Sequence, residues 1–178
     1  EGGHRVPFVV RWPGHVKGGT VSDRTICQTD IYATAAEING LKLAPANAPD
    51  SVSFLSTITG KEQDPRGATV HHSINGSFAV RKGPWKLCLC PGSGGWSAPK
   101  PAAAWKNKEL PRVQLYNLSD DPSEQTNLQA KNPEVVKELV SDLAQLIQNG
   151  RSTVGPEQEN NGEIPFREEI VRLFPELK

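Results

Sequence analysis

The dipeptide Asn75-Gly76, placed between two strand-like runs, constrains the fold of this chain more than any other feature of its sequence. Asn-Gly in this setting predicts a two-residue hairpin turn, because both central positions of such a turn need positive φ. A Gly-Pro pair predicts a second turn, after which residues 85–90 alternate between apolar and other side chains. A further strand is predicted at 113–118, so the residues predict a four-stranded antiparallel sheet.

A long amphipathic helix is predicted after the sheet. Asn132-Pro133-Glu134 has the features of a helix start, which are a capping residue, a proline at the first helical position and an acid in the first turn. One stripe of this helix is apolar and is expected to pack on one face of the sheet. The stripe consists of Val135, Val136, Leu139, Val140, Leu143, Leu146 and Ile147.

The first 60 residues have a different pattern. Residues 6–10 form a continuous apolar run, which is typical of a strand buried on both faces. A helix is predicted over 31–39 and a single helical turn over 54–58. Near the other end of the chain, residues 166–173 are expected to form a last short helix.

Composition excludes some classes of function. The chain of 178 residues has 20 Lys plus Arg and 20 Asp plus Glu, so its net charge is zero and no global field attracts nucleic acid. No apolar window is long enough to span a membrane. Cys88 and Cys90 point to one face of a strand, where they can be read as the start of a metal site or as small apolar side chains, and we favour the second interpretation.

Five blocks of the sequence, in order, resemble segments of the arylsulfatase-type sulfatases. The blocks are Glu1-Gly2-Gly3-His4-Arg5-Val6-Pro7 with Arg11-Trp12-Pro13-Gly14; Thr29-Asp30-Ile31; Asp50-Ser51-Val52-Ser53-Phe54-Leu55 with Thr59-Gly60; Ala79-Val80-Arg81-Lys82-Gly83-Pro84-Trp85-Lys86-Leu87; and Leu115-Tyr116-Asn117-Leu118 with Asp121-Pro122, Glu124 and Asn127-Leu128. Each block is weak alone, but their shared order is specific.

The resemblance implies an alkaline-phosphatase-like α/β fold for the parent protein. Residues 1–60 are then expected to be the C-terminal remnant of its large catalytic α/β domain. Residues 61–178 are expected to form an α+β C-terminal subdomain, with the four-stranded antiparallel sheet, a packed helix at about 133–149 and a terminal tail. The resemblance also implies that the parent is exported, to the periplasm, the exterior or the lysosome.

The resemblance further implies hydrolysis of sulfate esters, with a formylglycine nucleophile and Ca²⁺ or Mg²⁺. Formylglycine is made within a C/S-x-P-x-R motif, and the nearest match here, Ser97-Ala98-Pro99-Lys100, has Lys in place of Arg. No D-x-D or H-x-x-E cluster supplies metal ligands either. We therefore expect no catalytic residue and no metal ligand in this chain, and no activity from the chain alone.

Three histidines are candidates for binding a sulfated small molecule or a sulfated glycan. His4 is expected at the rim of the sulfate pocket or, equally, in a polar turn. His71 and His72 are adjacent on a predicted strand and so face opposite sides, where one can reach the substrate while the other packs or is solvated. Arg5 and Asp30 are expected to form a buried structural pair.

Two tryptophans, Trp96 and Trp105, lie in the long connection before the fourth strand, close to lysines. They can stack on a sulfated sugar or anchor the loop, and we favour anchoring. An alternative to the sulfatase interpretation is a stand-alone module, without catalysis, that binds sulfated glycans or a protein partner. An exposed cut edge of the large domain's truncated sheet is also expected to favour self-association.

Overall fold

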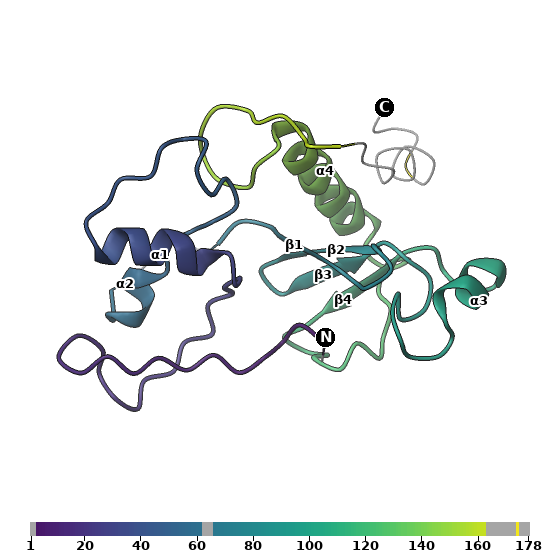
Figure 1. Ribbon diagram of the computed structural model, residues 1–178. Helices are drawn as coiled ribbons and strands as arrows, with labels where there is room; N and C mark the ends of the chain where they lie inside the picture. Colours follow the sequence, from purple (N-terminus) through teal and green to yellow (C-terminus); the bar gives the residue numbers. More distant parts are fainter. Residues whose placement is uncertain (1–2, 62–65, 163–173, 175–178) are drawn as a thin grey trace. The chain divides into compact units, whose positions relative to one another are not determined.

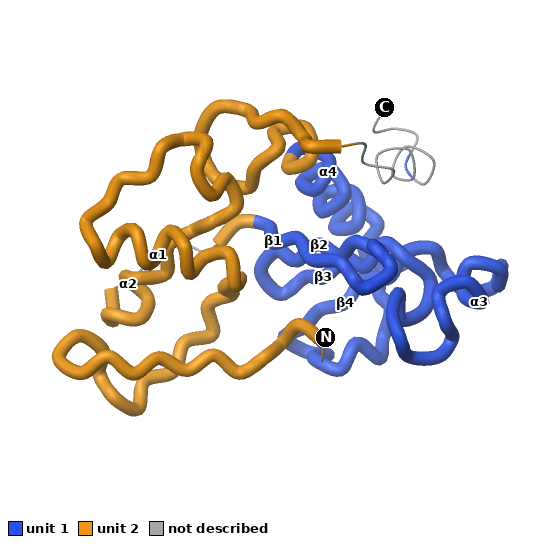
Figure 2. Tube along the Cα trace, viewed as in Figure 1, with its two compact units in different colours: residues 1, 68–145, 164–178 blue, residues 2–67, 146–163 orange. Residues whose placement is uncertain are grey.

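The computed structural model describes residues 3–61, 66–162 and 174. The chain divides into two compact units, coloured in Figure 2. One unit contains residues 68–145, and the other contains residues 2–67 together with 146–163. Each unit is described by itself below.

The predicted four-stranded antiparallel sheet is confirmed in the first of these units (Figure 1). Its strands are β1 (Thr69–His72), β2 (Phe78–Lys82), β3 (Trp85–Cys88) and β4 (Gln114–Asn117), and they lie in the order β1-β2-β3-β4 with every neighbouring pair antiparallel. The first hairpin turns at the predicted place, but the predicted two-residue turn with positive φ at both Asn75 and Gly76 is wrong: Ile74 and Asn75 are the central residues of the turn, and of Asn75 and Gly76 only the glycine has positive φ. There the amide of Gly76, whose φ is 83°, donates to the carbonyl of Ser73 at 2.9 Å.

Strand register assigns the two faces of the sheet. Val80 pairs with Leu87, which pairs with Leu115, so these three fully buried side chains form one row on one face. Lys82, two residues after Val80, lies on the same face and binds Glu138 and Asp142 of the long helix. This is therefore the face that the helix covers.

The covering helix, α4 (Pro133–Asn149), has nearly the predicted bounds. Its buried residues are Val136, Leu139, Val140 and Leu143. They belong to the predicted apolar stripe, and the sheet's buried row of Val and Leu side chains provides their partner surface. Burial of such side chains stabilises a fold by about 1.5–3 kcal/mol each.

The connection between β3 and β4 contains a short helix, α3 (Pro101–Lys106), that the sequence pattern did not predict. The surrounding Gly, Pro and Ser residues indicated a loop throughout. Proline at the first helical position followed by three alanines is nevertheless a favourable start, because proline fixes φ there and alanine has the best helix propensity. Ala104 of this helix is completely buried.

In the other unit, α1 (Asp30–Ile38) and the single turn α2 (Leu55–Ile58) confirm both predicted helical segments. The strand predicted at 6–10 is wrong, because the structure contains no strand between residues 3 and 61. Val6, Phe8 and Val9 are instead exposed. A strand needs neighbours for its backbone hydrogen bonds, and no neighbouring strand is described in this unit. The edge on which the self-association prediction depended is therefore not present here.

Within the described residues, the structure has no helix with the length and apolar character required to cross a bilayer. The short helix predicted at 166–173 lies outside the described residues.

Candidate functional site

His71 and His72 lie in β1 and face opposite sides, as their adjacency predicted. His71 is half-buried in a cross-strand row with Ala79 and Cys88, on the face opposite α4. His72 is exposed at the end of the strand, where its ring lies 6.1 Å from the ring of Phe78 and its Nδ1 is 3.0 Å from the Ser73 carbonyl oxygen. The two rings therefore do not share one site.

His4 and Arg5 belong to the other unit, and both are exposed. The predicted buried pair between Arg5 and Asp30 is wrong. Asp30 is buried and pairs with Arg66, whose Nη1 lies 2.5 Å from the Asp30 Oδ2. Sequence reasoning missed Arg66 because no matched block includes it.

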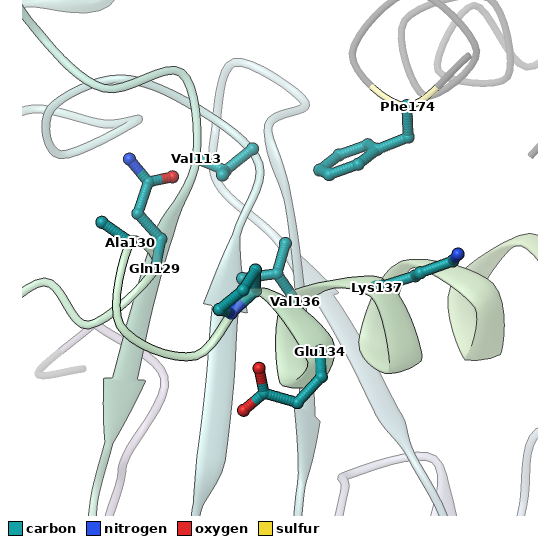
Figure 3. A pocket seen from close by; sticks show the side chains of 8 residues that line it. Val113, Gln129, Ala130, Glu134, Val136, Lys137 and Phe174 are labelled. Carbon is teal, nitrogen blue, oxygen red and sulfur yellow. The ribbon is translucent and has the colours of Figure 1, made fainter. Parts of the chain in front are cut away.

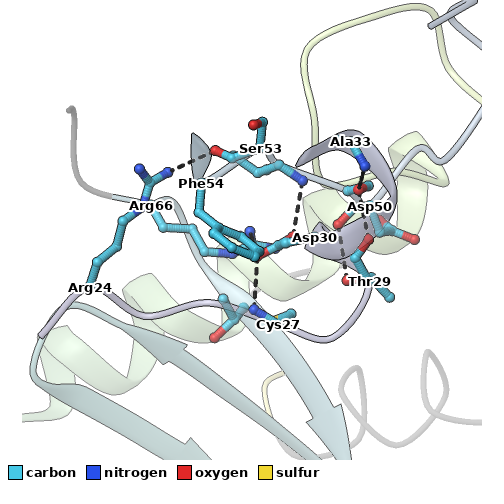
Figure 4. Close-up of polar contacts among 12 residues, drawn as sticks. Arg24, Cys27, Thr29, Asp30, Ala33, Asp50, Ser53, Phe54 and Arg66 are labelled. Atoms are coloured by element: carbon cyan, nitrogen blue, oxygen red, sulfur yellow. Dashed lines mark hydrogen bonds and ion pairs between the residues drawn. The ribbon is translucent and has the colours of Figure 1, made fainter. Parts of the chain in front are cut away.

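Asp30 organises the polar core of its unit (Figure 4). Besides Arg66, its carboxylate accepts hydrogen bonds from the amides of Cys27 at 2.8 Å and Val52 at 3.0 Å. The first amide lies just before α1, and the second lies in the segment that leads to α2. One carboxylate thus holds two separate backbone amides and the side chain of Arg66, which gives the aspartate of the Thr-Asp-Ile block a structural role.

Two hydroxyl groups extend this network. The Ser51 Oγ accepts from the Ala33 amide at 2.8 Å and donates to the Thr29 carbonyl at 2.7 Å. The Thr34 Oγ1 accepts from the Phe54 amide at 3.1 Å. The two sequence blocks that contain Asp30 and Ser51 are therefore joined by hydrogen bonds, and their side chains hold α1 against the start of α2.

A second buried ion pair joins two other blocks in the sheet unit. Lys86, on β3, is 3% exposed, and its Nζ lies 2.6 Å from the Oε1 of Glu124, which is 17% exposed. Lys86 lies on the face opposite α4, by its register with Arg81 and Tyr116. Desolvation opposes ionisation of Glu124, but nearby positive charge, that of Lys86 included, outweighs it and lowers the pKa of this carboxyl.

The loop after β4 explains how Glu124 reaches Lys86. Asp121 accepts hydrogen bonds from the amides of Gln125 and Thr126, both at 2.8 Å, which folds the loop tightly. Glu124 has a positive φ of 57°, a conformation uncommon for residues other than glycine. Asn127 then accepts from the Leu115 amide at 3.0 Å and so covers the outer edge of β4. The Asp-Pro-x-Glu-x-x-Asn block is therefore structural.

Burial also raises the pKa values of two other groups on this face of the sheet, Cys88 and Tyr116. Desolvation raises the pKa of the Cys88 thiol to about 12. Desolvation likewise raises the pKa of Tyr116, whose hydroxyl donates to the Gln114 side chain at 2.7 Å. Neither group is poised to act as a nucleophile or a base near neutral pH.

A cavity of about 520 Å³ lies at the start of α4 (Figure 3). Its walls include Val113, Pro133 and Val136, and the ring of Phe174 points into it. Glu134 and Lys137 supply its charged groups. No constellation of catalytic groups lines this space, and we assign it a packing role.

The two tryptophans of the β3–β4 connection differ. Trp105, in α3, is half-buried, with the guanidinium of Arg112 lying 5.3 Å from its ring centroid and donating to its carbonyl at 2.9 Å. This is the anchoring arrangement that the sequence favoured. Trp96 is 78% exposed, which does not fit anchoring.

Metal-binding side chains are not gathered in the part of the chain that the structure describes. Across residues 3–61 and 66–162, no group of three His, Cys, Asp or Glu side chains is arranged to hold a metal ion. The three cysteines, which all lie within these ranges, form no disulfide. These residues therefore do not fit a divalent cation.

The fold and sequence have clear relatives. A solved structure from work on the metabolism of multiple glycosaminoglycans by Bacteroides thetaiotaomicron superposes with a TM-score of 0.63 and 33% identity, over 79% of this chain and 28% of that one. The fold is thus that of a sulfatase C-terminal subdomain, as the resemblance implied. Residues 64–172 match the family described as the C-terminal region of aryl-sulfatase, and the chain belongs to that family.

Two curated relatives agree with this assignment. An N-acetylgalactosamine-6-O-sulfatase of Bacteroides thetaiotaomicron is 37% identical over 153 residues, which cover 83% of this chain and 28% of the relative. Arylsulfatase A of Bos taurus is 30% identical over 179 residues, which cover 93% of this chain and 35% of the relative. The chain therefore spans about a third of the length of these sulfatases.

Proposed function

We propose that the protein to which this chain belongs hydrolyses sulfate esters of carbohydrates, and that these 178 residues supply its C-terminal subdomain rather than its catalytic groups. The observation that carries the proposal is the 37% identity to an N-acetylgalactosamine-6-O-sulfatase across 83% of the chain. The proposed substrate class follows from that relative.

The chemistry supports placing the catalytic groups outside this sequence. Sulfate ester hydrolysis needs a nucleophile, cationic stabilisation of the sulfate oxygens and an acid for the leaving oxygen. The sequence has no C/S-x-P-x-R motif for a formylglycine, and the described residues do not fit a divalent cation. We propose that the whole protein uses both a formylglycine and Ca²⁺ or Mg²⁺, which would activate the nucleophile and offset charge on sulfate.

Exposed apolar side chains support a larger domain packed against residues 3–40. Val9 is 88% exposed, and Phe8 and Val6 are about half exposed. Ile31 and Tyr32 of α1 are also at least half exposed. Contiguous exposed apolar surface marks an interaction site in a soluble protein. We propose that the remaining part of the sulfatase covers it, and that the whole protein is exported.

The histidines predicted to contact substrate remain proposals. His72 is exposed at the end of β1, and His71 is half-buried on the other face. His4 is exposed in the other unit. If one of these rings contacts the sugar, replacing it by alanine in the full-length enzyme raises KM for a sulfated disaccharide without lowering kcat. The three variants are His71→Ala, His72→Ala and His4→Ala. Unchanged KM in all three variants rules out this role.

The direct test of the function is an assay of sulfate release. The full-length protein, matured with its formylglycine, is incubated with 6-sulfated N-acetylgalactosamine and with an aryl sulfate, and this chain alone is assayed beside it. We expect turnover by the full-length protein only. Its Ser or Cys within C/S-x-P-x-R, replaced by Ala, is the matched control and should abolish turnover. Activity of the 178-residue chain alone contradicts the proposal.

A further inference from the structure

The connection between β3 and β4 presents an indole to solvent. Trp96 is 78% exposed, whereas Trp105, in the same connection, is held by Arg112. A tryptophan side chain has a large apolar ring and is usually covered in a folded protein. Its exposure on this loop makes it available for a contact with a group outside the described residues.

The loop that carries Trp96 is braced by its own hydrogen bonds. The Ser93 hydroxyl donates to the Ser97 carbonyl at 3.1 Å and accepts from the Gly95 amide at 3.2 Å. The Lys100 ammonium donates to the carbonyl of Trp96 itself. These bonds close the loop on both sides of the indole.

The base of the loop is fixed to the sheet. The Gln114 side-chain amide on β4 donates to the carbonyls of Cys90 at 2.8 Å and Gly92 at 2.7 Å. Gly94 has φ +63°, and a Cβ there would lie 2.7 Å from the Cys90 Sγ. The backbone therefore packs too closely for a side chain at this position. Because the loop is ordered before any ligand arrives, little conformational entropy is lost on binding.

Other exposed groups lie at the same end of the sheet. In an antiparallel sheet of this order, the β1–β2 turn and the β3–β4 connection share one end. A Cβ added at Gly94 would lie 3.4 Å from the Ser77 Cβ, which places the loop against that turn. His72 and Asn75 are exposed there, and Ile74 is 75% exposed. Polar hydrogen-bonding groups thus lie at the same end of the sheet as the loop that carries the indole.

The local charge is positive although the chain as a whole is neutral. Residues 91–111 contain Lys100, Lys106 and Lys108 and a single acid, Glu109. All three lysines are exposed. An anionic ligand is therefore favoured over a neutral one at this end of the sheet.

We propose that Trp96 is a platform on which a sugar ring of a sulfated saccharide stacks, with Lys100 beside it to bind a sulfate group. The apolar face of a pyranose ring covers the indole, and the hydroxyls meet the polar side chains of the β1–β2 turn. The ligand class rests on the proposed function. The platform itself rests on the exposure, bracing and charge of this loop.

The test uses the full-length protein and a chondroitin 6-sulfate hexasaccharide, with binding measured by calorimetry. Trp96→Ala is expected to raise Kd by about tenfold, and Trp96→Phe, which keeps a ring, by no more than about threefold. Lys100→Gln is expected to flatten the dependence of Kd on salt. Val154→Ala, which removes an exposed apolar side chain from the other unit, is the control and leaves Kd unchanged.

Kinetics separate the platform from the catalytic centre. For the hexasaccharide, Trp96→Ala should raise KM with kcat unchanged, while turnover of a small aryl sulfate stays at the wild-type rate. Binding that depends on Trp96 in a protein with no sulfatase activity upholds the platform and removes the proposed function. If the protein has sulfatase activity but Trp96→Ala leaves hexasaccharide binding unchanged, the proposed function stands and the platform is refuted.

Two further results overturn the platform. One is that the wild-type protein fails to bind the hexasaccharide. The other is that Trp96→Ala lowers Tm of the full-length protein as much as Trp105→Ala does, which would mean that the indole packs against the rest of the enzyme.

Discussion

Replacing Glu124 by Gln should weaken the sheet unit strongly, because the substitution removes a negative charge in direct contact with a buried ammonium group. Lys86 is 3% exposed and lies 2.6 Å from Glu124. Breaking such a pair by removing one partner costs about 3–5 kcal/mol. The reverse change, Lys86→Met, should cost less, since the more exposed carboxyl of Glu124 can take up a proton.

The assay is hydrogen exchange of the β2, β3 and β4 amides in the full-length protein, which reports opening of this unit alone. A loss of about 3–5 kcal/mol accelerates exchange through that opening by roughly 100- to 4,000-fold. The matched control is Lys82→Met, because Lys82 also binds carboxylates, at 2.8 Å, but is 42% exposed. Exposed pairs contribute about 0–1 kcal/mol, so exchange should change by no more than about fivefold.

The effect of Glu124→Gln should also depend on pH. Lys86 contributes to lowering the pKa of Glu124 in this chain below its ordinary value of 4.5. The pair's contribution is therefore complete above pH 4.5 and is lost as pH falls through the folded pKa. The variant and the wild type should converge in acid. Wild-type protection in Glu124→Gln at neutral pH, or an effect no larger than that of Lys82→Met, refutes the reasoning.

Three other predictions concern single residues. Asp30→Asn removes the charge of one partner of a buried ion pair and should destabilise its unit by about 3–5 kcal/mol. The measurement is hydrogen exchange of the α1 amides, which should become faster. Unchanged exchange would mean that the network is dispensable. Cys88 is half-buried and desolvation raises its pKa to about 12, so it should react slowly with iodoacetamide at about pH 8 until urea is added; rapid labelling of Cys88 in the native protein contradicts this. Gly94→Ala should lower the free energy of unfolding by about 1–3 kcal/mol more than Gly19→Ala does. Both glycines have positive φ, but only at Gly94 would the added Cβ meet a neighbour, the Cys90 Sγ at 2.7 Å. Equal effects of the two substitutions would refute the clash.

The sheet and the long helix could be predicted because local signals specify them. Asn75 and Gly76 are turn residues, of which Gly76 has positive φ, and the α4 stripe has helical periodicity over many residues. The strand at 6–10 could not be excluded in the same way. An apolar run specifies burial but not the hydrogen-bonding neighbour, and the described part of this unit supplies none.

Contacts between distant residues were the hardest to predict. Asp30 was expected to form a buried pair with Arg5, because both residues stand in matched blocks. Its partner is instead Arg66, which lies 36 positions after Asp30 in the sequence. The pair between Lys86 and Glu124 was not anticipated, although each residue belongs to a matched block. Sequence separation hides such pairs, because register and loop conformation decide which charges meet.

The buried pairs indicate what the matched blocks do. Asp30 accepts amides from two segments, and Glu124 ties the loop after β4 to β3, so these blocks specify the scaffold. Specificity needs residues that the scaffold does not occupy. The loop bearing Trp96 lies between two matched blocks, is fixed at its base by Gln114 and leaves its indole in solvent. A scaffold held by buried pairs can present such a loop rigidly while the loop's exposed side chains stay available for contacts.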